Sequence, residues 1–399
     1  MRLQPFETRV GAARQLRFLQ PVQAFEVPQG RVAGLLETEL DQTVSRGEFR
    51  KEEALLRALG LLSGPRSLRE RMLGFQSSSL SGFYSPANDR LYLVAKAGAR
   101  ISRADGSVLV HELTHALQAQ HTQLLTATLG ISEDQDLLFA LGTLLEGDAL
   151  WTEQRDMQLQ LGLAPPCPEA FARQFAADER ALGDEEESRW IWESLLEQYP
   201  RGYALAVSLV EAGGTAALDA ALRDPPLSSE EVLHPERYLR PGRRHVLRDL
   251  RTPLALFAPH RSCRLEAQDS FGEIGLRIWA RERGLAAAAA AAAAAGWDAD
   301  RAWVLTCPRG ETVAWLIQFD SPLEARALES ALVGHGSAGL RLSLRGRRLL
   351  LSRGLGEAGR RYLLEQLKGR PVRNLAAWLR AHPEVDRRAQ LVRSRSRSR

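Results

Sequence analysis

The chain has 399 residues, more than one hydrophobic core normally accommodates, so we expect two domains. Apolar residues make up 44% and charged residues 26%, which excludes a largely disordered chain, and no apolar run reaches the roughly 18 residues of a membrane helix. The net charge is +4, and the four arginines of the C-terminal Arg-Ser repeat account for all of it, which argues against a nucleic-acid binding body.

The N-terminus and the cysteines bear on the cellular compartment. The first residues carry a charge but no apolar stretch, so no secretory signal is visible. We therefore expect a cytoplasmic protein, with an export signal encoded by an upstream start as the alternative. Cys167, Cys263 and Cys307 are widely separated and odd in number, which argues against a disulfide framework and against a cysteine-based zinc site.

Hydrophobic periodicity predicts a mostly helical first part. A strand is expected within residues 16–27. A β-hairpin is expected at residues 82–94, where aromatic and β-branched residues flank the turn-forming Ser85-Pro86-Ala87-Asn88-Asp89. Apolar residues at helical spacing, with capping residues before several of them, predict helices at 32–44, 52–62, 105–120, 134–161, 168–181, 188–198, 202–212 and 215–222.

The composition changes near residue 242, within an arginine-rich segment. Beyond it, short strands are expected at 302–306, 312–319, 340–344 and 348–351. The alanine run at 286–295 favours a helix that carries no chemistry. The sequence therefore predicts an α+β chain with a first domain at 1–242, a smaller α+β domain at 243–390 and a disordered Arg-Ser tail at 391–399.

The motif that carries chemistry is His111-Glu112-Leu113-Thr114-His115, an H-E-x-x-H sequence on a predicted helix. Two histidines four residues apart lie about 40° apart around a helix, so both imidazoles project from one face and can share a metal ion. Glu112 can reach a water held by that ion without being a ligand. Zinc accepts imidazole and carboxylate ligands and leaves one position open, so one Zn²⁺ is the expected cofactor.

A third ligand is required, and two residues compete for the role. His121 follows His115 by six residues, the spacing of metalloproteases in which a glycine breaks the helix between them. Here Gln118, a good helix former, occupies the glycine position, so a continuing helix would direct His121 elsewhere. Glu146, on the next predicted helix and beside an apolar stripe, needs a positive partner and is the better candidate. Gly147 would permit close approach of the motif helix.

The motif, together with Glu146-Gly147-Asp148-Ala149, resembles the gluzincin metallopeptidases and within them a large bacterial subgroup of gluzincin-like proteins. The resemblance extends over roughly residues 10–240 and includes the segments 82–93 and 230–239. It implies a mostly helical zincin-like domain with a hairpin beside the active-site helix. It also implies zinc binding by His111, His115 and Glu146, with Glu112 as general base and then acid.

The resemblance leaves two roles open. Many gluzincins have an acidic residue four positions after the glutamate ligand that orients a histidine, but this chain has Leu150 there. Asp148 and Glu153 are the alternatives for that role. A donor for the oxyanion of the tetrahedral intermediate is also needed, and the downstream candidates are His234, Tyr238 and Tyr203.

These observations favour a zinc metalloendopeptidase acting on peptide or protein substrates, with no nucleic acid partner and no membrane span. One alternative is a catalytically silent, zinc-stabilised binding or scaffold protein, which would usually close the ion with four protein ligands. Another is a nucleic-acid binder that uses the Arg-Ser tail and binds with steep salt dependence. The sequence carries no signal for the oligomeric state.

Overall fold

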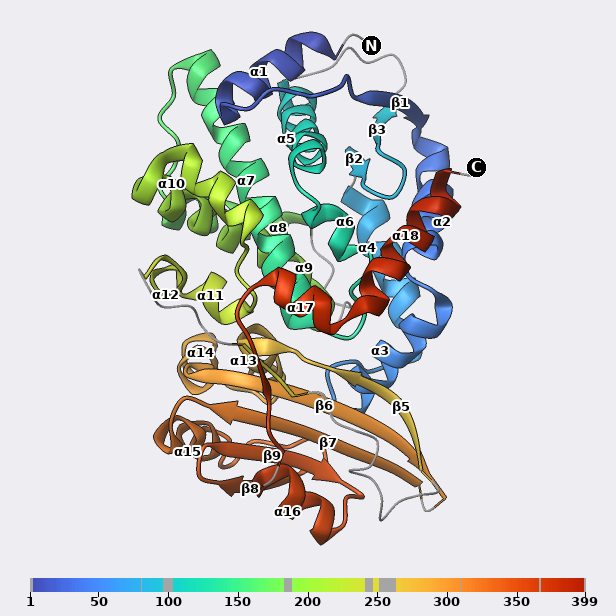
Figure 1. Cartoon of the computed structure of the whole chain (residues 1–399), viewed down its shortest axis with the longest axis vertical. Helices are drawn as coiled ribbons and strands as arrows, with labels where there is room; N and C mark the ends of the chain where they lie inside the picture. Colours follow the sequence, from blue (N-terminus) through green and yellow to red (C-terminus); the bar gives the residue numbers. More distant parts are fainter. Residues whose placement is uncertain are drawn as a thin grey trace.

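The computed structural model describes residues 3–79, 81–95, 103–182, 189–240, 247–250, 263–308, 310–365 and 367–397. The fold is α+β, as the sequence predicts. A helical half carries a small sheet, and a second half is built on a five-stranded sheet (Figure 1). The change of composition at residue 242 lies outside the described residues.

The helices of the first half include all those expected from periodicity. They are α1 (Gln4–Arg14), the short η1 (Gln29–Arg31), α2 (Val32–Thr43), α3 (Arg46–Ala58), α4 (Leu68–Ser79), α5 (Arg103–His121), α6 (Leu124–Thr128), α7 (Gln135–Leu161), α8 (Pro168–Leu182), α9 (Arg189–Leu196), α10 (Gln198–Arg223), α11 (Ser229–Leu233) and α12 (Pro235–Leu239). Asp134 caps α7 by accepting from the Leu137 N–H, and Gly162, with a φ of 69°, ends the helix. The two helices expected at 202–212 and 215–222 are both present within α10, where the non-helical backbone of Gly213 and Gly214 forms a kink between them.

The small sheet lies beside α5. Its strands are β1 (Gln23–Pro28), β2 (Gly82–Ser85) and β3 (Arg90–Ala95), in the order β1-β3-β2. The hairpin predicted at 82–94 is present, because β2 and β3 pair antiparallel with Tyr84 opposite Leu91. β1 pairs parallel to β3, so β2 is left as an edge strand.

The second half contains the sheet β5-β6-β7-β9-β8, with every neighbouring pair antiparallel. Its strands are β5 (Arg264–Asp269), β6 (Trp297–Cys307), β7 (Gly310–Phe319), β8 (Arg341–Arg345) and β9 (Arg348–Arg353). β5 is additional to the strands expected from the sequence. The remaining elements are α13 (Gly272–Glu282), α14 (Ala287–Ala294), α15 (Pro322–Ala331), α16 (Glu357–Glu365), α17 (Leu375–Ala381), α18 (Pro383–Arg397), and β4 (Leu247–Asp249) paired with β10 (Arg370–Val372).

The two halves share one hydrophobic core. A single cluster of buried residues runs from Leu141 of α7 through Trp279 of α13 to Trp315 and Leu349 of the large sheet. The Trp279 indole also donates a hydrogen bond to the carbonyl oxygen of Leu59, 3.0 Å away. Burial of apolar surface across this boundary therefore holds the sheet against the helical half.

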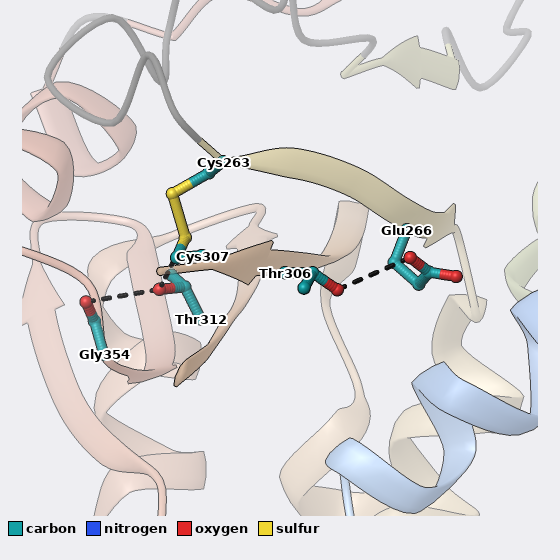
Figure 2. Close-up of a disulfide and its surroundings, with 6 residues drawn as sticks. All are labelled: Cys263, Glu266, Thr306, Cys307, Thr312 and Gly354. Carbon is teal, nitrogen blue, oxygen red and sulfur yellow. Dashed lines mark hydrogen bonds between the residues drawn. A yellow bond between two sulfur atoms is a disulfide. The ribbon is translucent and has the colours of Figure 1, made fainter. Parts of the chain in front are cut away.

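A disulfide joins two of the cysteines, contrary to the sequence argument. Cys263 and Cys307 stand opposite each other where β5 begins and β6 ends, with their Cα atoms 4.2 Å apart (Figure 2). The two cysteines are 44 residues apart in the sequence, and the pairing register of β5 with β6 brings them together. The sequence alone does not show this register. Cys167 is free and exposed.

The C-terminal segment is helical up to Arg397, so the prediction of a disordered tail is wrong for residues 391–397. Figure 1 shows α18 beside α2 and α6 of the helical half. Arg388 forms an ion pair with Glu48 at 2.9 Å, and the Ser396 hydroxyl donates to Gln42 at 2.6 Å. An apolar face of α18 that includes Val385 and Val392 is buried. This packing stabilises a helix in a segment whose composition alone suggests disorder.

One helical stretch, Arg189–Arg223, is long and apolar enough to cross a membrane, with a mean hydropathy of 1.4 in a window that is 33% buried. A single stretch of this kind is weak evidence, because a core helix passes the same test. Its α10 part packs along α7, which is the arrangement of a core helix and is consistent with the expected absence of a membrane span.

Candidate metal centre

Two helices bring three ligand atoms together. His111 and His115 project from α5, and Glu146 projects toward them from α7. The His111 Nε2 atom lies 3.1 Å from Glu146 Oε2 and 3.2 Å from His115 Nε2, and His115 Nε2 lies 3.7 Å from Glu146 Oε1. These residues form the only such group of potential metal ligands among the described residues.

The donor set fits a zinc ion. Ligand atoms of a tetrahedral site with bonds of about 2.0–2.1 Å lie about 3.3 Å apart, and the three observed separations bracket that value. The two Nε2 atoms face each other at hydrogen-bond distance, so either a proton on one of them or a cation shared by both lone pairs lies between them. The carboxylate of Glu146 completes a set of three acceptors that converge on one point.

Glu112 lies next to this group and is held by the hairpin. Its Oε2 atom accepts a hydrogen bond from the backbone N–H of Tyr84 in β2, 2.8 Å away. Leu109 and Leu113 lie on the face of α5 opposite the two histidines and pack in one cluster with Tyr84 and Leu91. This packing holds the helix on the small sheet. The hairpin therefore lies beside the candidate metal centre, and it orients the Glu112 carboxylate, which is not one of the three grouped ligand residues.

The charges of the site reinforce one another. Burial lowers the pKa of His111, but hydrogen bonds to Glu146 and Glu153 outweigh it and raise that pKa well above its usual value. The pKa of His115 is also raised, because the charge of Glu146 overcomes burial. Burial raises the pKa of Glu112, whereas at Glu146 the imidazoles overcome burial and hold the pKa far below its usual range. Surroundings that favour positive charge on the imidazoles also favour a bound cation.

The two imidazoles have different partners on their outer nitrogens. The Nδ1 atom of His111 lies 3.7 Å from Glu153 Oε2, within ion-pair distance. The Nδ1 atom of His115 lies 2.9 Å from Gln118 Oε1, and Gln118 in turn donates to Asp148. Glu153 and Asp148 were the two alternatives for orienting a histidine. Glu153 lies beside His111, and Asp148 is connected to His115 through Gln118.

Close packing of α7 on α10 positions Glu146. A Cβ atom on Gly147 would lie 2.1 Å from the carbonyl oxygen of Gly202, so the two backbones are in direct contact. The helix that approaches Gly147 is thus α10, and the expectation that Gly147 accommodates the motif helix is wrong. Glycine on both sides of the crossing is what allows this approach.

Tyr199, one turn before Gly202 on α10, was missed by sequence reasoning. The charge of Glu146, together with burial and the charge of Glu112, raises the pKa of Tyr199 well above its usual value. The ring stacks on Phe175 of α8 with centroids 5.5 Å apart. Within the described part of the chain, the Tyr199 hydroxyl has no hydrogen-bond partner. No local sequence signal identifies it, because its position depends on the contact of α7 with α10 at Gly147 and Gly202.

The downstream residues proposed as oxyanion donors are engaged elsewhere. His234 lies 3.1 Å from the carboxylate of Glu273 on α13, a fully buried acid that also accepts a hydrogen bond from Arg277. The Tyr238 hydroxyl donates to the backbone oxygen of Asp224, and the Tyr203 hydroxyl donates to that of Pro166. None of these hydrogen bonds is to His111, His115 or Glu146, so the structure does not bring His234 and Tyr238 into the ligand group.

His121 is not a ligand either. α5 remains helical through its position, and its Nε2 atom lies 2.8 Å from the backbone oxygen of Arg17. The helix former at position 118 therefore has the effect expected from the sequence.

A hollow of about 280 Å³ lies between α8, α9 and α10. Phe175, Trp192, Leu196 and Pro200 are among its apolar lining residues, and its charged lining residues are Arg201, Glu169, Glu193 and Glu197. Phe175 also stacks on Tyr199, which connects the wall of the hollow to the surroundings of the metal centre.

No protein-family model matches the chain, and no curated protein and no solved structure shows significant similarity to it.

Proposed function

We propose that the chain is a zinc-dependent metallopeptidase of the gluzincin type, with a zincin-like helical half. The observation that carries the proposal is the convergence of His111, His115 and Glu146 on one point with the non-ligand carboxylate of Glu112 beside it. A structural zinc site usually closes four protein ligands, and the described residues supply three here.

Zinc bound at this point supplies a Lewis acid that polarises a carbonyl group and lowers the pKa of water toward about 7. Glu112 takes the proton of the attacking water and passes it to the leaving amine, as a general base and then a general acid. The Tyr84 N–H holds the carboxylate in place for both steps.

Tyr199 is the proposed donor to the oxyanion. Its hydroxyl is free of other described partners and lies within electrostatic range of Glu146 and Glu112. A phenol at this position can stabilise the negative charge that develops on the carbonyl oxygen of a peptide.

The edge strand β2 is the proposed binding surface for an extended peptide. Along an antiparallel pair, the groups that do not bond to the partner strand point outward at every second residue. The Tyr84 N–H points away from β3 and donates to Glu112, so Tyr84 and Gly82 are the residues of β2 whose backbone groups point outward. The groups left for a substrate backbone are therefore the C=O of Tyr84 and both the N–H and the C=O of Gly82.

The test is replacement of Glu112 by Gln, with metal content and cleavage of an unfolded protein substrate measured together. We expect the E112Q chain to bind one zinc ion as the wild type does and to lose at least about 10²-fold in turnover. Wild-type cleavage rates in E112Q would refute the mechanism. A wild-type chain that binds zinc but cleaves no substrate would favour the scaffold alternative.

A further inference from the structure

The carboxamide of Gln118 connects the motif helix to α7. Its Nε2 atom donates to the backbone oxygen of Leu145 at 3.0 Å and to Asp148 Oδ2 at 2.9 Å. The Leu145 carbonyl oxygen can only accept, and so can the carboxylate of Asp148, which is ion-paired with Arg14. Two acceptors on one side fix the orientation of the amide, so its Oε1 atom must face His115.

This orientation determines the tautomer of His115. An amide oxygen accepts and cannot donate, so the Nδ1 atom of His115, 2.9 Å from Gln118 Oε1, carries the ring hydrogen. The Nε2 atom then presents its lone pair toward His111 and Glu146. Only this tautomer can bind a metal ion at the point where the three ligand atoms converge.

Arg14 anchors the arrangement from the N-terminal helix. Its side chain is 1% exposed, its Nε donates to Asp148, and its NH2 group donates to Asp219 of α10 at 2.6 Å. One buried guanidinium therefore joins α1, α7 and α10 behind the metal centre. Charge-assisted bonds of this kind hold a carboxylate in one geometry more firmly than neutral bonds do.

We propose that Gln118, oriented by Asp148 and Arg14, is a positioning residue that presets the His115 imidazole for metal binding. The inference rests on the proposed metal centre. It adds that His115 is oriented by a neutral amide, that of Gln118, where a metal-binding histidine usually has a carboxylate partner. It also adds that the residue that anchors this arrangement, Arg14, lies in α1, about a hundred residues before the motif in sequence.

The first experiment compares two glutamines of the same helix in the full-length chain. Gln118→Met removes the amide but keeps the length of the side chain. Gln120→Met is the matched control, because the Gln120 amide bonds only to the backbone of Leu19 and Gln20. Zn²⁺ affinity is measured by competition with a chromogenic chelator, and the visible spectrum of the Co²⁺ form reports ligand geometry.

We expect Gln118→Met to weaken Zn²⁺ binding by about 10- to 100-fold and to change the Co²⁺ spectrum. Gln120→Met should stay within about twofold of the wild type. The urea midpoint of each metal-free chain identifies a variant that has lost its fold. Wild-type affinity and spectrum in a folded Gln118→Met chain would overturn the proposal.

The second experiment uses Asp148→Asn, whose new amide can turn its own NH₂ group toward Gln118 and so removes the fixed orientation. We expect weaker Zn²⁺ binding, and we expect the double variant with Gln118→Met to bind no more weakly than Gln118→Met alone, because both act on one imidazole. Additive losses would overturn the proposal. If Gln118→Met does not fold, unchanged binding in Asp148→Asn overturns it.

Neither experiment measures peptide cleavage. A chain that binds zinc in a Gln118-dependent manner and cleaves no peptide would therefore refute the proposed function while supporting this inference.

Discussion

The contact between Gly147 and Gly202 gives the sharpest test of how the metal centre is built. In Gly147→Ala the new Cβ would lie 2.1 Å from the backbone oxygen of Gly202. An ordinary van der Waals contact between carbon and oxygen is about 3.4 Å, so α7 and α10 must separate by about 1 Å. Overpacking of this kind costs about 1–3 kcal/mol, against a gain of up to about 1 kcal/mol in helix propensity. We expect a net loss of stability of about 1–2 kcal/mol.

The matched control lies on the same helix. In Gly142→Ala the new Cβ would meet the carboxamide of Gln198, whose Oε1 would lie 2.2 Å away, and this is the far end of a flexible side chain that can turn away. The helix-propensity gain should then dominate, leaving this variant as stable as the wild type or up to about 1 kcal/mol more stable. Urea unfolding measures both variants. Equal midpoints for the two, or a Gly147→Ala chain as stable as the wild type, would refute the reasoning.

Three further predictions concern the catalytic, acidic and cysteine residues. Tyr199→Phe should lower turnover by about 10²- to 10³-fold with zinc still bound, whereas the control Tyr203→Phe should stay near the wild type. Cleavage rate and metal content are measured for both variants. Equal activities of the two variants would exclude Tyr199 as a donor. Burial raises the pKa of Glu52 from 4.5 to about 7, so the folded state holds this proton more tightly than the unfolded chain and stability falls as pH rises from about 4.5 to 7. Glu52→Gln should flatten that dependence and stabilise the chain at pH 8 by about 1–3 kcal/mol in urea titrations, and a less stable variant at pH 8 would contradict the cause given. Replacing Cys263 and Cys307 by serine should lower the free energy of unfolding by about 2–4 kcal/mol and leave zinc affinity unchanged; a change in affinity would show that the two halves are coupled through the disulfide.

Local patterns in the sequence predict many of the helices and strands and the three residues that form the ligand group. Helical spacing places His111 and His115 on one face, and the need to balance a carboxylate beside an apolar stripe points to Glu146. The hairpin is predicted from its turn residues, and the structure adds that the Tyr84 N–H bonds to Glu112. In each of these cases the sequence signal is local: the helical spacing of two histidines, a carboxylate beside an apolar stripe, or a set of turn residues.

Contacts between distant segments could not be predicted in the same way. Tyr199 comes within electrostatic range of Glu146 and Glu112 on a helix whose approach to α7 depends on two glycines, 55 positions apart, and neither glycine alone indicates a contact. The disulfide depends on strand register, and the order of the C-terminal helix depends on partners such as Glu48 near the other end of the chain. His234 and Tyr238 looked like catalytic groups, but each satisfies a polar group of its own neighbourhood.

The dependence of the site on packing means that lost activity alone would not identify a chemical role. The residues proposed to act on the substrate, Glu112 and Tyr199, should change turnover with zinc bound. A residue that presets a ligand, Gln118, should change zinc affinity and the Co²⁺ spectrum without unfolding the metal-free chain. A residue that spaces the helices, Gly147, should lower the stability of the metal-free chain first, since its contact is between backbones and involves no ligand atom. Because the three effects appear in different measurements, the same set of variants can separate catalysis, ligand positioning and helix packing at one site.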